Sequence, residues 1–323
     1  MAPSDAVLAG WFEAHRAFLW GLSYRITGSA ADADDVVQET FVRAFQHAPE
    51  QLDNPRQWLA RVAVNAGRDV LRRRKRRRYV GPWLPTPIET SDEALPSYEP
   101  AVEGRTLEGR YDLLESASFA FLVALEALTP TQRAVLLLRD VFDYSVAEVA
   151  AALDLSDGNV RIVHHRARRV MEEYERRRSV PTAQTRARTD HALHAFLQLL
   201  GRGDVKGIEQ MLTADVKAVT DGGGQITASR RPIVGAGPVA RFFARLAASR
   251  TGHLEVSIRS INQFPAAFLE FSPARGRRPR RLVLSIDVNP AGLISNVRVI
   301  ANATKLLALR TTSPIARAAL GVR

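Results

Sequence analysis

The chain has 323 residues, 46% of them hydrophobic, which is enough for two or three domains with buried cores. Its 45 Lys and Arg against 34 Asp and Glu give a formal charge of +11, mostly as arginine, which favours a polyanionic partner over a small acidic substrate. Cysteine is absent, so a disulfide framework, a thiolate metal site and a thiol nucleophile are excluded. The chain shows neither a charged-then-apolar leader nor an apolar run of 18 residues, so we expect a cytoplasmic protein that neither is secreted nor spans a membrane.

Two amphipathic helices are predicted at the amino end. Apolar residues recur at helical spacing from Leu8 to Ile26, and Gly28 offers a left-handed stop. Ser29 then caps a second helix, whose apolar residues as far as Phe45 are expected to face inward. The outer face of this helix is acidic and consists of Asp34, Asp35, Gln38 and Glu39. In so basic a chain this face favours a basic partner, although acidic residues near a helix amino terminus are also common on solvated surfaces.

A third helix begins at Asn54 and Pro55 and carries a polar stripe opposite its packed side. The stripe has steps of four, three and four residues and consists of Arg61, Asn65, Arg68 and Arg72. It continues through Arg73 into seven consecutive cations at residues 72–78. Such a run is best tolerated beside a phosphate backbone, where each contact releases counterions, and the alternative is a solvated helix end.

Residues 79–107 are predicted to be a connector, because they hold five prolines and show no sustained periodicity. Within it, Trp83, Leu84 and Pro85 form an apolar segment that would need cover from another part of the protein. A buried helical face is then expected from Leu113 to Leu128, followed by a new helix start at Thr129.

Residues 145–171 read as a helix-turn-helix. Ser145 with Glu148 makes a capping box for a short helix, Asp154 and Leu155 interrupt the period, and Ser156 caps a second, basic helix. In this motif the second helix enters the major groove, so the candidates to reach base edges or phosphates are Arg161, Ile162, His165 and Arg166. The alternative is an ordinary helical hairpin with a solvated basic face.

After Arg178 the pattern changes to α+β. Helices are expected over 191–200, 203–212 and 238–247, and strands over 216–220, 254–262, 267–271, 281–288 and 293–300. A glycine-rich turn, Asp221 to Gly224, follows the first of these strands.

The ordered combination of the Asp34–Phe41 segment, Trp58-Leu59 with Asn65, Asp69 and Arg72, and the carboxy-terminal helix-turn-helix resembles the bacterial extracytoplasmic-function (ECF) sigma factors. The resemblance implies an all-helical sigma-2 domain at residues 1–78, a linker at 79–107 and an all-helical sigma-4 domain at 108–178. It implies binding to core RNA polymerase, with the acidic face on the beta-prime clamp helices and sigma-4 near the beta flap. It also implies two contacts with promoter DNA. The minus-ten element meets the stripe of Asn65, Arg68, Arg72 and Arg73, with the 47–55 loop near an extruded base. The minus-thirty-five element is read by the Arg161–Arg166 helix.

Residues 185–323 are similar to the SnoaL/NTF2-like fold, a cone that often holds a pocket, and the whole chain resembles ECF sigma factors with such an extension, the SigJ-like group. Three segments carry this resemblance: Trp83–Pro87 in the linker, the glycine turn Asp221, Gly222, Gly223 and Gly224 with Gln225, and Asn302 to Leu306 with Lys305. Thr86 and Gln225 stand where such proteins usually carry an acid and a lysine, so a hydrogen bond could replace an ion pair if the two positions meet. We expect the extension to dock on the linker, with Trp83, Leu84 and Pro85 near Asp221–Gly224, and to modulate the sigma factor in cis.

Two other classes of function fit part of the sequence. An enzyme or small-molecule sensor would suit the cone, but its scattered Asp204, Asp215, Asp221, His253 and Asp287 have no spacing that forces them together. A stand-alone DNA-binding repressor would explain the helix-turn-helix but neither the acidic face nor the arginine stripe. We therefore expect a sigma factor without catalytic residues, cofactor or metal, with a ligand of the cone left open.

Overall fold

The amino-terminal unit is built from three helices: α1 (Asp5–Thr27), α2 (Ala30–His47) and α3 (Pro55–Arg76). The predicted signals are in place, since Gly28 ends α1 with a φ of 67° and Ser29 accepts a hydrogen bond from the amide of Asp32. Phe45 differs from its prediction, because it lies at the rim of the apolar stripe and is 62% exposed, while Ala44 takes the buried position.

The computed structural model describes residues 3–49, 51–76, 79–90, 111–249, 253–272 and 278–309. Several predicted features lie outside these residues: Arg77 and Arg78 of the basic run, residue 50 of the 47–55 loop, residues 91–107 of the linker, the first three residues of the predicted sigma-4 domain, and the tail after residue 309.

The second helical unit contains α4 (Leu113–Ser116), α5 (Phe119–Leu125), α6 (Pro130–Asp140), α7 (Val146–Leu153) and α8 (Asp157–Arg176). The single buried face expected over 113–128 is divided into two short helices, because Ser118 accepts a hydrogen bond from the Phe121 amide and starts a new helix. Thr129 and Gln132 form the capping box that begins α6.

The two helical units share one apolar core. Leu22 and Ile26 of α1, Val64 of α3, Leu136 of α6 and Val149 of α7 are fully buried in the same cluster. Helix α3 packs on both α6 and α7, and α1 packs on α6. In this conformation the first and second units are therefore packed against each other.

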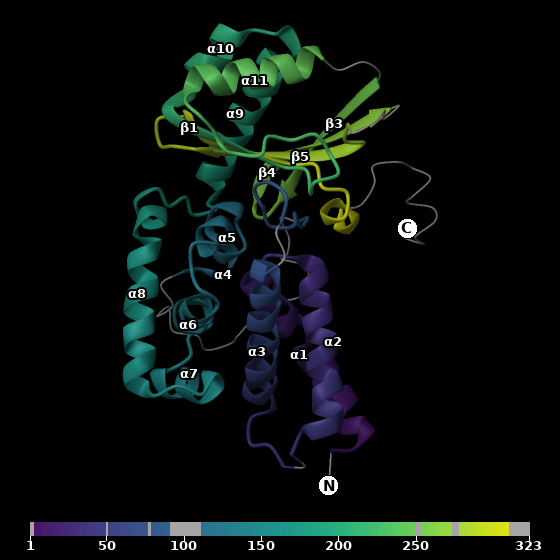
Figure 1. Cartoon of the computed structure of the whole chain (residues 1–323), viewed down its shortest axis with the longest axis vertical. Coiled ribbons are helices and arrows are strands. Elements are labelled where there is room, and N and C mark those ends of the chain that lie inside the picture. The colour runs from purple at the N-terminus through teal and green to yellow at the C-terminus, as the bar shows by residue number, and fades with distance from the viewer. Residues whose placement is uncertain are drawn as a thin grey trace.

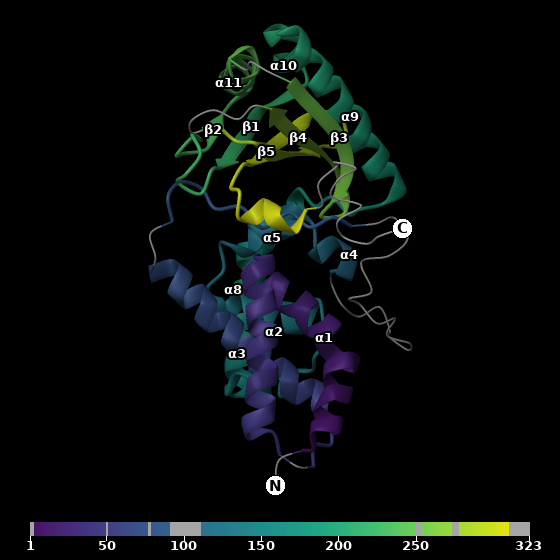
Figure 2. The same cartoon turned by 90° about the vertical axis from the view of Figure 1, so that its right-hand side faces the viewer.

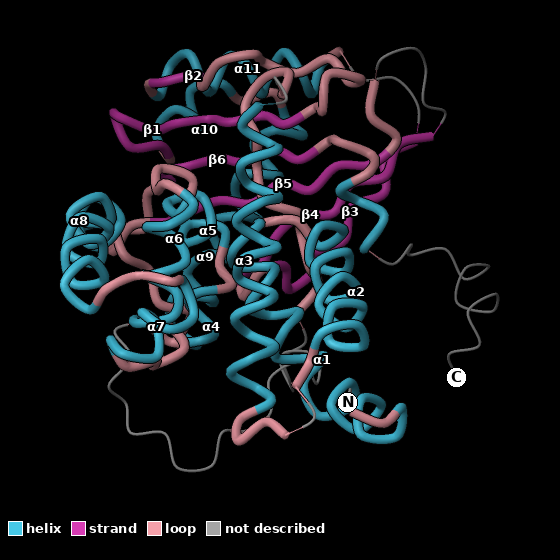
Figure 3. The backbone as a smooth tube through the Cα atoms, turned by 60° about the horizontal axis from the view of Figure 1, so that its bottom comes forward, coloured by secondary structure: helices cyan, strands magenta, loops and turns pink. Residues whose placement is uncertain are grey.

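The carboxy-terminal unit is α+β, as expected. It consists of α9 (Ala183–Arg202), α10 (Val205–Gln210), β1 (Leu212–Asp221), β2 (Ile233–Val234), α11 (Ala236–Ala248), β3 (His253–Ile261), β4 (Phe264–Ser272), β5 (Arg281–Val288), β6 (Ile294–Ile300) and a 3₁₀ turn at Lys305–Ala308. The strands form one sheet in the order β2-β1-β6-β5-β4-β3, in which β1 and β6 are parallel and the other neighbours antiparallel (Figure 3). Strand β2 was not predicted, because two residues are too few to show the alternation of apolar and polar side chains that marks a strand.

Each face of the sheet packs against a different part of the chain (Figures 1 and 2). One face is covered by α9 and α11, with Phe196 and Phe243 in edge contact at 5.7 Å. The opposite face holds Phe268, Val283 and Ile300 in a cluster with Leu84 of the linker and Phe119 of α5. Leu84 is 1% exposed, so the apolar linker segment does find its cover. None of the helices in the described ranges is long and apolar enough to cross a membrane.

Candidate nucleic-acid interface

The predicted helix-turn-helix is formed by α7 and α8. Ser145 and Glu148 make the reciprocal capping box, and Asp154 ends α7 in the left-handed region with a φ of 55°. Ser156 then accepts a hydrogen bond from the Asn159 amide and begins α8. The short turn between two capped helices leaves α8 free to present its outer face.

That outer face carries the side chains predicted to reach DNA. Arg161, Ile162, His165 and Arg166 are all exposed. A hollow of about 540 Å³ runs beside them and is lined in part by Arg139, Arg168 and Arg169. His164 points inward instead and bonds Asp140 at 2.8 Å, which ties α8 to α6. Guanidinium groups on an exposed helix face can bind phosphate or guanine bidentately.

The acidic face predicted on α2 is present as an exposed surface. Asp34, Asp35, Gln38 and Glu39 all lie on the solvent side of the helix. Asp34 accepts a hydrogen bond from the Trp20 indole at 2.7 Å, and Glu39 pairs with Arg43 at 2.7 Å. These contacts fix the side chains at the surface without neutralising the whole face.

The polar stripe on α3 is only partly accessible in this conformation. Arg61, Arg72 and Arg73 are exposed, whereas Asn65 and Arg68 lie under α6 and α7. The amide of Asn65 reaches the carbonyl of Ala152 at 3.4 Å. Arg68 donates to Thr131 and to Asn65, each at 3.0 Å, and burial lowers its pKa, with a further contribution from Arg72. The prediction that the whole stripe faces DNA is therefore not met in the packed state, because sequence periodicity did not show that α6 and α7 cover its centre.

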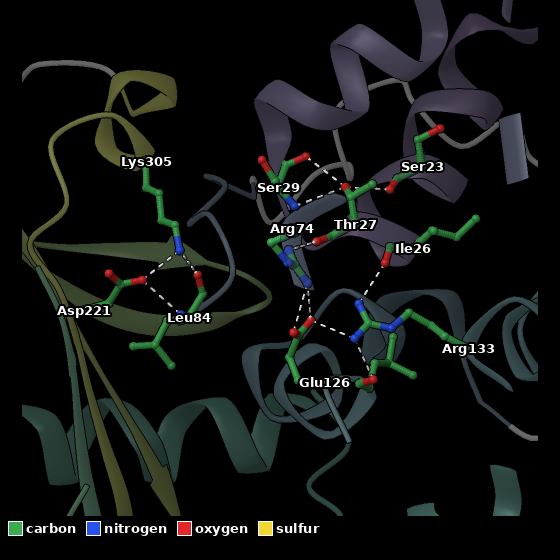
Figure 4. Close-up of polar contacts among 11 residues, drawn as sticks. Ser23, Ile26, Thr27, Ser29, Arg74, Leu84, Glu126, Arg133, Asp221 and Lys305 are labelled. Carbon is green, nitrogen blue, oxygen red and sulfur yellow. Dashed lines mark hydrogen bonds and ion pairs between the residues drawn. The ribbon is translucent and has the colours of Figure 1, made fainter. Parts of the chain in front are cut away.

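One arginine of the basic run is held by both helical units. Arg74 donates to the Thr27 carbonyl at 2.6 Å and forms a two-pronged pair with Glu126, the residue after α5 (Figure 4). Glu126 also accepts from Arg133, which is 2% exposed and donates to the carbonyls of Ile26 and Leu125. Six charge-assisted hydrogen bonds at this point join the end of α1, the end of α3 and the α5–α6 corner.

Trp83 continues this contact toward the carboxy-terminal unit. Its ring lies 3.8 Å from the guanidinium carbon of Arg74 and 4.2 Å from the ammonium of Lys305. It also presses on Gly28, where an added side-chain carbon would come within 2.5 Å of the ring. The Trp83 ring thus fills the space beside the glycine at the end of α1 and reaches the glycine turn through Lys305, which bonds Asp221.

The glycine turn holds the linker through a buried carboxylate. Asp221 is fully buried and accepts hydrogen bonds from the Leu84 amide at 2.9 Å and the Tyr79 hydroxyl at 2.5 Å. Lys305 donates to Asp221 at 2.7 Å and to the Leu84 carbonyl (Figure 4). Burial lowers the pKa of Lys305 to about 8, against the opposing effect of Asp221. The linker is thus fixed by a charged pair whose hydrogen bonds are satisfied.

The remaining residues of the predicted contact are close by. Asn302 donates to the Tyr79 hydroxyl at 3.0 Å, Gly223 lies directly against Asn302, and Gly224 lies against Val80. Gly222 and Pro85 are buried. Both Gly223 and Gly224 have positive φ, which allows the close approach of the two backbones.

The suggested replacement of an acid–lysine pair by Thr86 and Gln225 is wrong. Thr86 is buried, its amide donates to the Gly28 carbonyl at 2.9 Å and its carbonyl accepts from the Tyr24 hydroxyl at 2.6 Å. Gln225 is exposed. Similar sequence motifs do not fix which residues pair, and here the buried ion pair is Lys305 with Asp221.

A further contact residue, Asn262, was missed. It occupies the β3–β4 turn with a φ of 49° and is fully buried. Its amide nitrogen donates to the Tyr24 hydroxyl and to the Ala117 carbonyl, both at 2.8 Å, and its carbonyl oxygen accepts from the Ile88 amide at 3.1 Å. One side chain therefore joins α1, the α4–α5 corner and the linker to the sheet. The pair Asn262-Gln263 between two strands is a hairpin signal, but nothing in it indicated burial at a domain junction.

Comparison with known proteins gives the same two helical units. The Sigma-70 region 2 family matches residues 11–77 and the Sigma-70 region 4 family matches residues 118–171. The ECF RNA polymerase sigma factor SigJ of Mycobacterium tuberculosis is 33% identical over 244 residues, which is 73% of this chain and 72% of that protein. The ECF RNA polymerase sigma factor SigG of the same species is 38% identical over 179 residues, 48% of this chain and 45% of that one.

A solved structure is also similar over nearly the full length. The crystal structure of the M. tuberculosis extracytoplasmic function sigma factor SigJ matches with a TM-score of 0.68 and 25% identity, and covers 93% of this chain and 98% of that chain. The match therefore includes the α+β unit as well as the helical units.

Proposed function

The chain belongs to the ECF RNA polymerase sigma factors. We propose which of its surfaces bind core polymerase, which bind promoter DNA, and how its carboxy-terminal unit controls this binding. The family implies binding to core RNA polymerase and to promoter DNA, and it is a family of initiation factors rather than a class of enzymes. We place its action in the cytoplasm, where the polymerase works.

The acidic face of α2 contacts the beta-prime clamp helices, and the residues that carry this contact are Asp34, Asp35, Gln38 and Glu39. The α3 stripe contacts the minus-ten element, and the outer face of α8 reads the minus-thirty-five element. The functional units are residues 1–78, 108–178 and 185–323. Support comes from exposure and charge: the acidic residues, Arg161 and Arg166 of α8, and Arg72 all lie on accessible surfaces.

The conformation in which the two helical units pack against each other is a restrained state, in which part of the α3 stripe cannot reach DNA. The observation that carries this proposal is the position of Asn65 and Arg68, which bond Ala152 and Thr131 across the interface with α6 and α7. These two side chains meet promoter DNA only after the helical units separate. The carboxy-terminal unit opposes separation, because Asp221, Asn262 and Lys305 attach it to the linker and Asn262 also to both helical units.

Reconstitution tests this function directly. The full chain is mixed with core RNA polymerase, and complex formation and transcription are measured on a promoter library. Wild-type chain should co-elute with the core enzyme and select a set of promoters. Asp35→Lys with Glu39→Lys should weaken core binding by about tenfold or more, since like charges placed across an interface cost several kcal/mol.

A matched variant, Glu209→Lys with Glu255→Lys, makes the same change of charge at exposed positions of the carboxy-terminal unit. It should bind the core enzyme like the wild type. Equal loss of affinity in both variants would mean that net charge, not the α2 face, determines binding.

A further inference from the structure

Most of the excess positive charge of this chain lies in one unit. Residues 185–323 contain 21 of the 45 Lys and Arg but only eight of the 34 Asp and Glu, a formal charge of +13. Residues 1–184 contain the other 24 and 26, a formal charge of −2. The two sigma units and the linker together are thus slightly acidic, and the attached α+β unit is the strongly basic one. A charge of this size attracts a polyanion and needs an explanation beyond attachment to the linker.

The loop between β1 and β2 presents two of these charges on a fixed base. Arg230 and Arg231 are both exposed, and within the described residues neither guanidinium forms an ion pair or a side-chain hydrogen bond. The backbone beneath them is held, because the Ser229 amide donates to the Thr220 hydroxyl at 2.8 Å and the Ser229 hydroxyl donates to the Arg231 carbonyl at 2.6 Å. The backbone of the two arginines is therefore held in a defined position, while their guanidinium groups remain available to bind a ligand.

This loop lies beside the carboxyl end of α3, the end that carries the basic run. A side chain added at Gly81 would lie 4.0 Å from the Ser229 carbonyl, and Val80 packs on Gly224 of the same loop. Figure 2 shows the end of α3 and the β1–β2 loop on the same side of the molecule. Five residues of chain join Arg76 to Gly81, and they span about 17 Å at most. Exposed Arg72, Arg73, Lys75 and Arg76 and the pair Arg230–Arg231 thus fall within about 38 Å, or about eleven base pairs of duplex.

A hollow of about 330 Å³ separates the linker from this loop. It is lined by Val80 and Gly81 on one side and by Thr227 and Arg230 on the other. Thr227 is exposed, so its hydroxyl and the Arg230 guanidinium offer donors toward the hollow. Hydroxyl and guanidinium donors are the groups that bind phosphate oxygens.

We propose that the Arg230–Arg231 loop is a third DNA-contacting surface, which binds the phosphate backbone of duplex promoter DNA next to the end of α3. This inference rests on the proposed function, since it takes α3 to lie on promoter DNA. The loop stays with α3 when the helical units separate, because its anchors, Asp221 to Tyr79 and Leu84, belong to the chain segment directly after α3. The contact carries no base specificity and adds affinity that depends on salt.

The test measures how promoter affinity depends on salt. Full-length chain is assembled with core RNA polymerase, and binding to a labelled duplex promoter, selected by the wild-type holoenzyme, is followed between about 50 and 200 mM KCl. Each phosphate contact contributes about 0.9 to the slope of log affinity against log salt. Arg230→Gln with Arg231→Gln should therefore lower the slope by about 1.8, and affinity at about 0.1 M salt should fall by nearly tenfold for each phosphate that is no longer neutralised.

Two control variants separate a local contact from net charge. Arg202→Gln with Lys206→Gln removes two exposed charges beside α10, at the end of the molecule far from α3 (Figure 1), and should leave the slope unchanged. Arg230→Lys with Arg231→Lys keeps the charge and should keep most of the slope. The proposal is overturned if the Arg230/Arg231 glutamine variant keeps the wild-type slope, or if the α10 variant lowers it equally.

Failure of the proposed function has a different signature. If the wild-type holoenzyme selects no promoter at all, the assignment of α3 to promoter DNA fails, and this inference fails with it. If the wild-type holoenzyme initiates normally while the loop variant binds with an unchanged slope, the inference alone is wrong.

Discussion

Lys305→Met is the change that most directly tests how the carboxy-terminal unit holds the linker. The substitution keeps the length and the apolar stem of the side chain but removes the ammonium group that bonds Asp221 and the Leu84 carbonyl. Asp221 is fully buried, so its carboxylate is left with Tyr79, the Leu84 amide and the Gly223 amide as donors and with no compensating charge.

The expected cost follows from that geometry. Removing one partner of a buried ion pair typically costs about 3–5 kcal/mol, because the other charge stays buried and unpaired. The loss of the cation contact with Trp83 adds to it. Since each 1.4 kcal/mol is about a factor of ten, undocking of the linker should become at least about 100-fold more frequent.

Hydrogen exchange at linker amides measures this undocking. The amides of Leu84 and Thr90 donate to Asp221 and to the Ser260 carbonyl, so both are protected only while the linker is docked. In Lys305→Met both should exchange at least about 100-fold faster, while amides in the middle of α6 stay unchanged. The matched control is Lys206→Met, which removes an exposed lysine of the same unit and should have no effect.

The double variant Asp221→Asn with Lys305→Met completes the cycle. With both charges removed, no buried carboxylate lacks a cationic partner. Protection of the linker amides against hydrogen exchange should therefore recover most of the way to the wild-type value. Two results would refute the reasoning: unchanged exchange in Lys305→Met, or a double variant that loses more protection than the two single variants together.

Three further outcomes are expected. Asn262→Ala removes three hydrogen bonds and leaves the Ala117 carbonyl without this donor, so docking of the carboxy-terminal unit on the helical units should weaken by about 3 kcal/mol and promoter binding by the holoenzyme should rise. Gln225→Ala, at an exposed site, should change neither quantity, and equal behaviour of the two variants would count against a restraining role. Arg161→Ala or Arg166→Ala should weaken binding at the upstream promoter element by about 1–3 kcal/mol if the arginine contacts a base bidentately, and unchanged promoter selection in both would remove this face from a reading role. The pKa of Lys305 is 10.5 in the unfolded chain and about 8 in the folded one, so between these pH values the unfolded chain binds more protons. The free energy of unfolding of the wild type, relative to that of Lys305→Met, should therefore rise by about 1–2 kcal/mol from pH 7.5 to 9.5. A difference between the two proteins that stays constant or shrinks over this range would contradict the lowered pKa.

Local signals in the sequence predicted the elements well. Gly28, Ser29, Thr129, Ser145 and Ser156 each begin or end the helix that their residue type indicated. The reason is physical: capping depends on a few neighbouring residues, so it can be read without knowing the rest of the fold. The exposed faces of α2 and α8 follow from the same short-range periodicity.

Contacts between distant segments were predicted only in part. The apolar Trp83–Pro85 segment showed that the linker needs cover, and the family resemblance indicated Asp221 and Lys305 as its neighbours. Burial of Asn65 and Arg68 under α6 and α7 could not be predicted, because polar residues at an interface between units look the same in sequence as polar residues at a surface. Asn262 was hidden for a similar reason, since a polar turn residue is usually exposed.

The attachment of the linker has a consequence for newly synthesised chains. Its last anchor, Lys305, is made long after α8 ends at Arg176. Synthesis at about 5–20 residues per second leaves an interval of about 6–25 s between the two. During this interval the helical units exist without the sheet that later covers Leu84 and Phe119. Under the proposed restraint, each chain carries its own inhibitory unit in a strict one-to-one ratio, yet this unit is completed last. We therefore expect a polymerase that binds the nascent chain early to meet helical units that are not yet restrained.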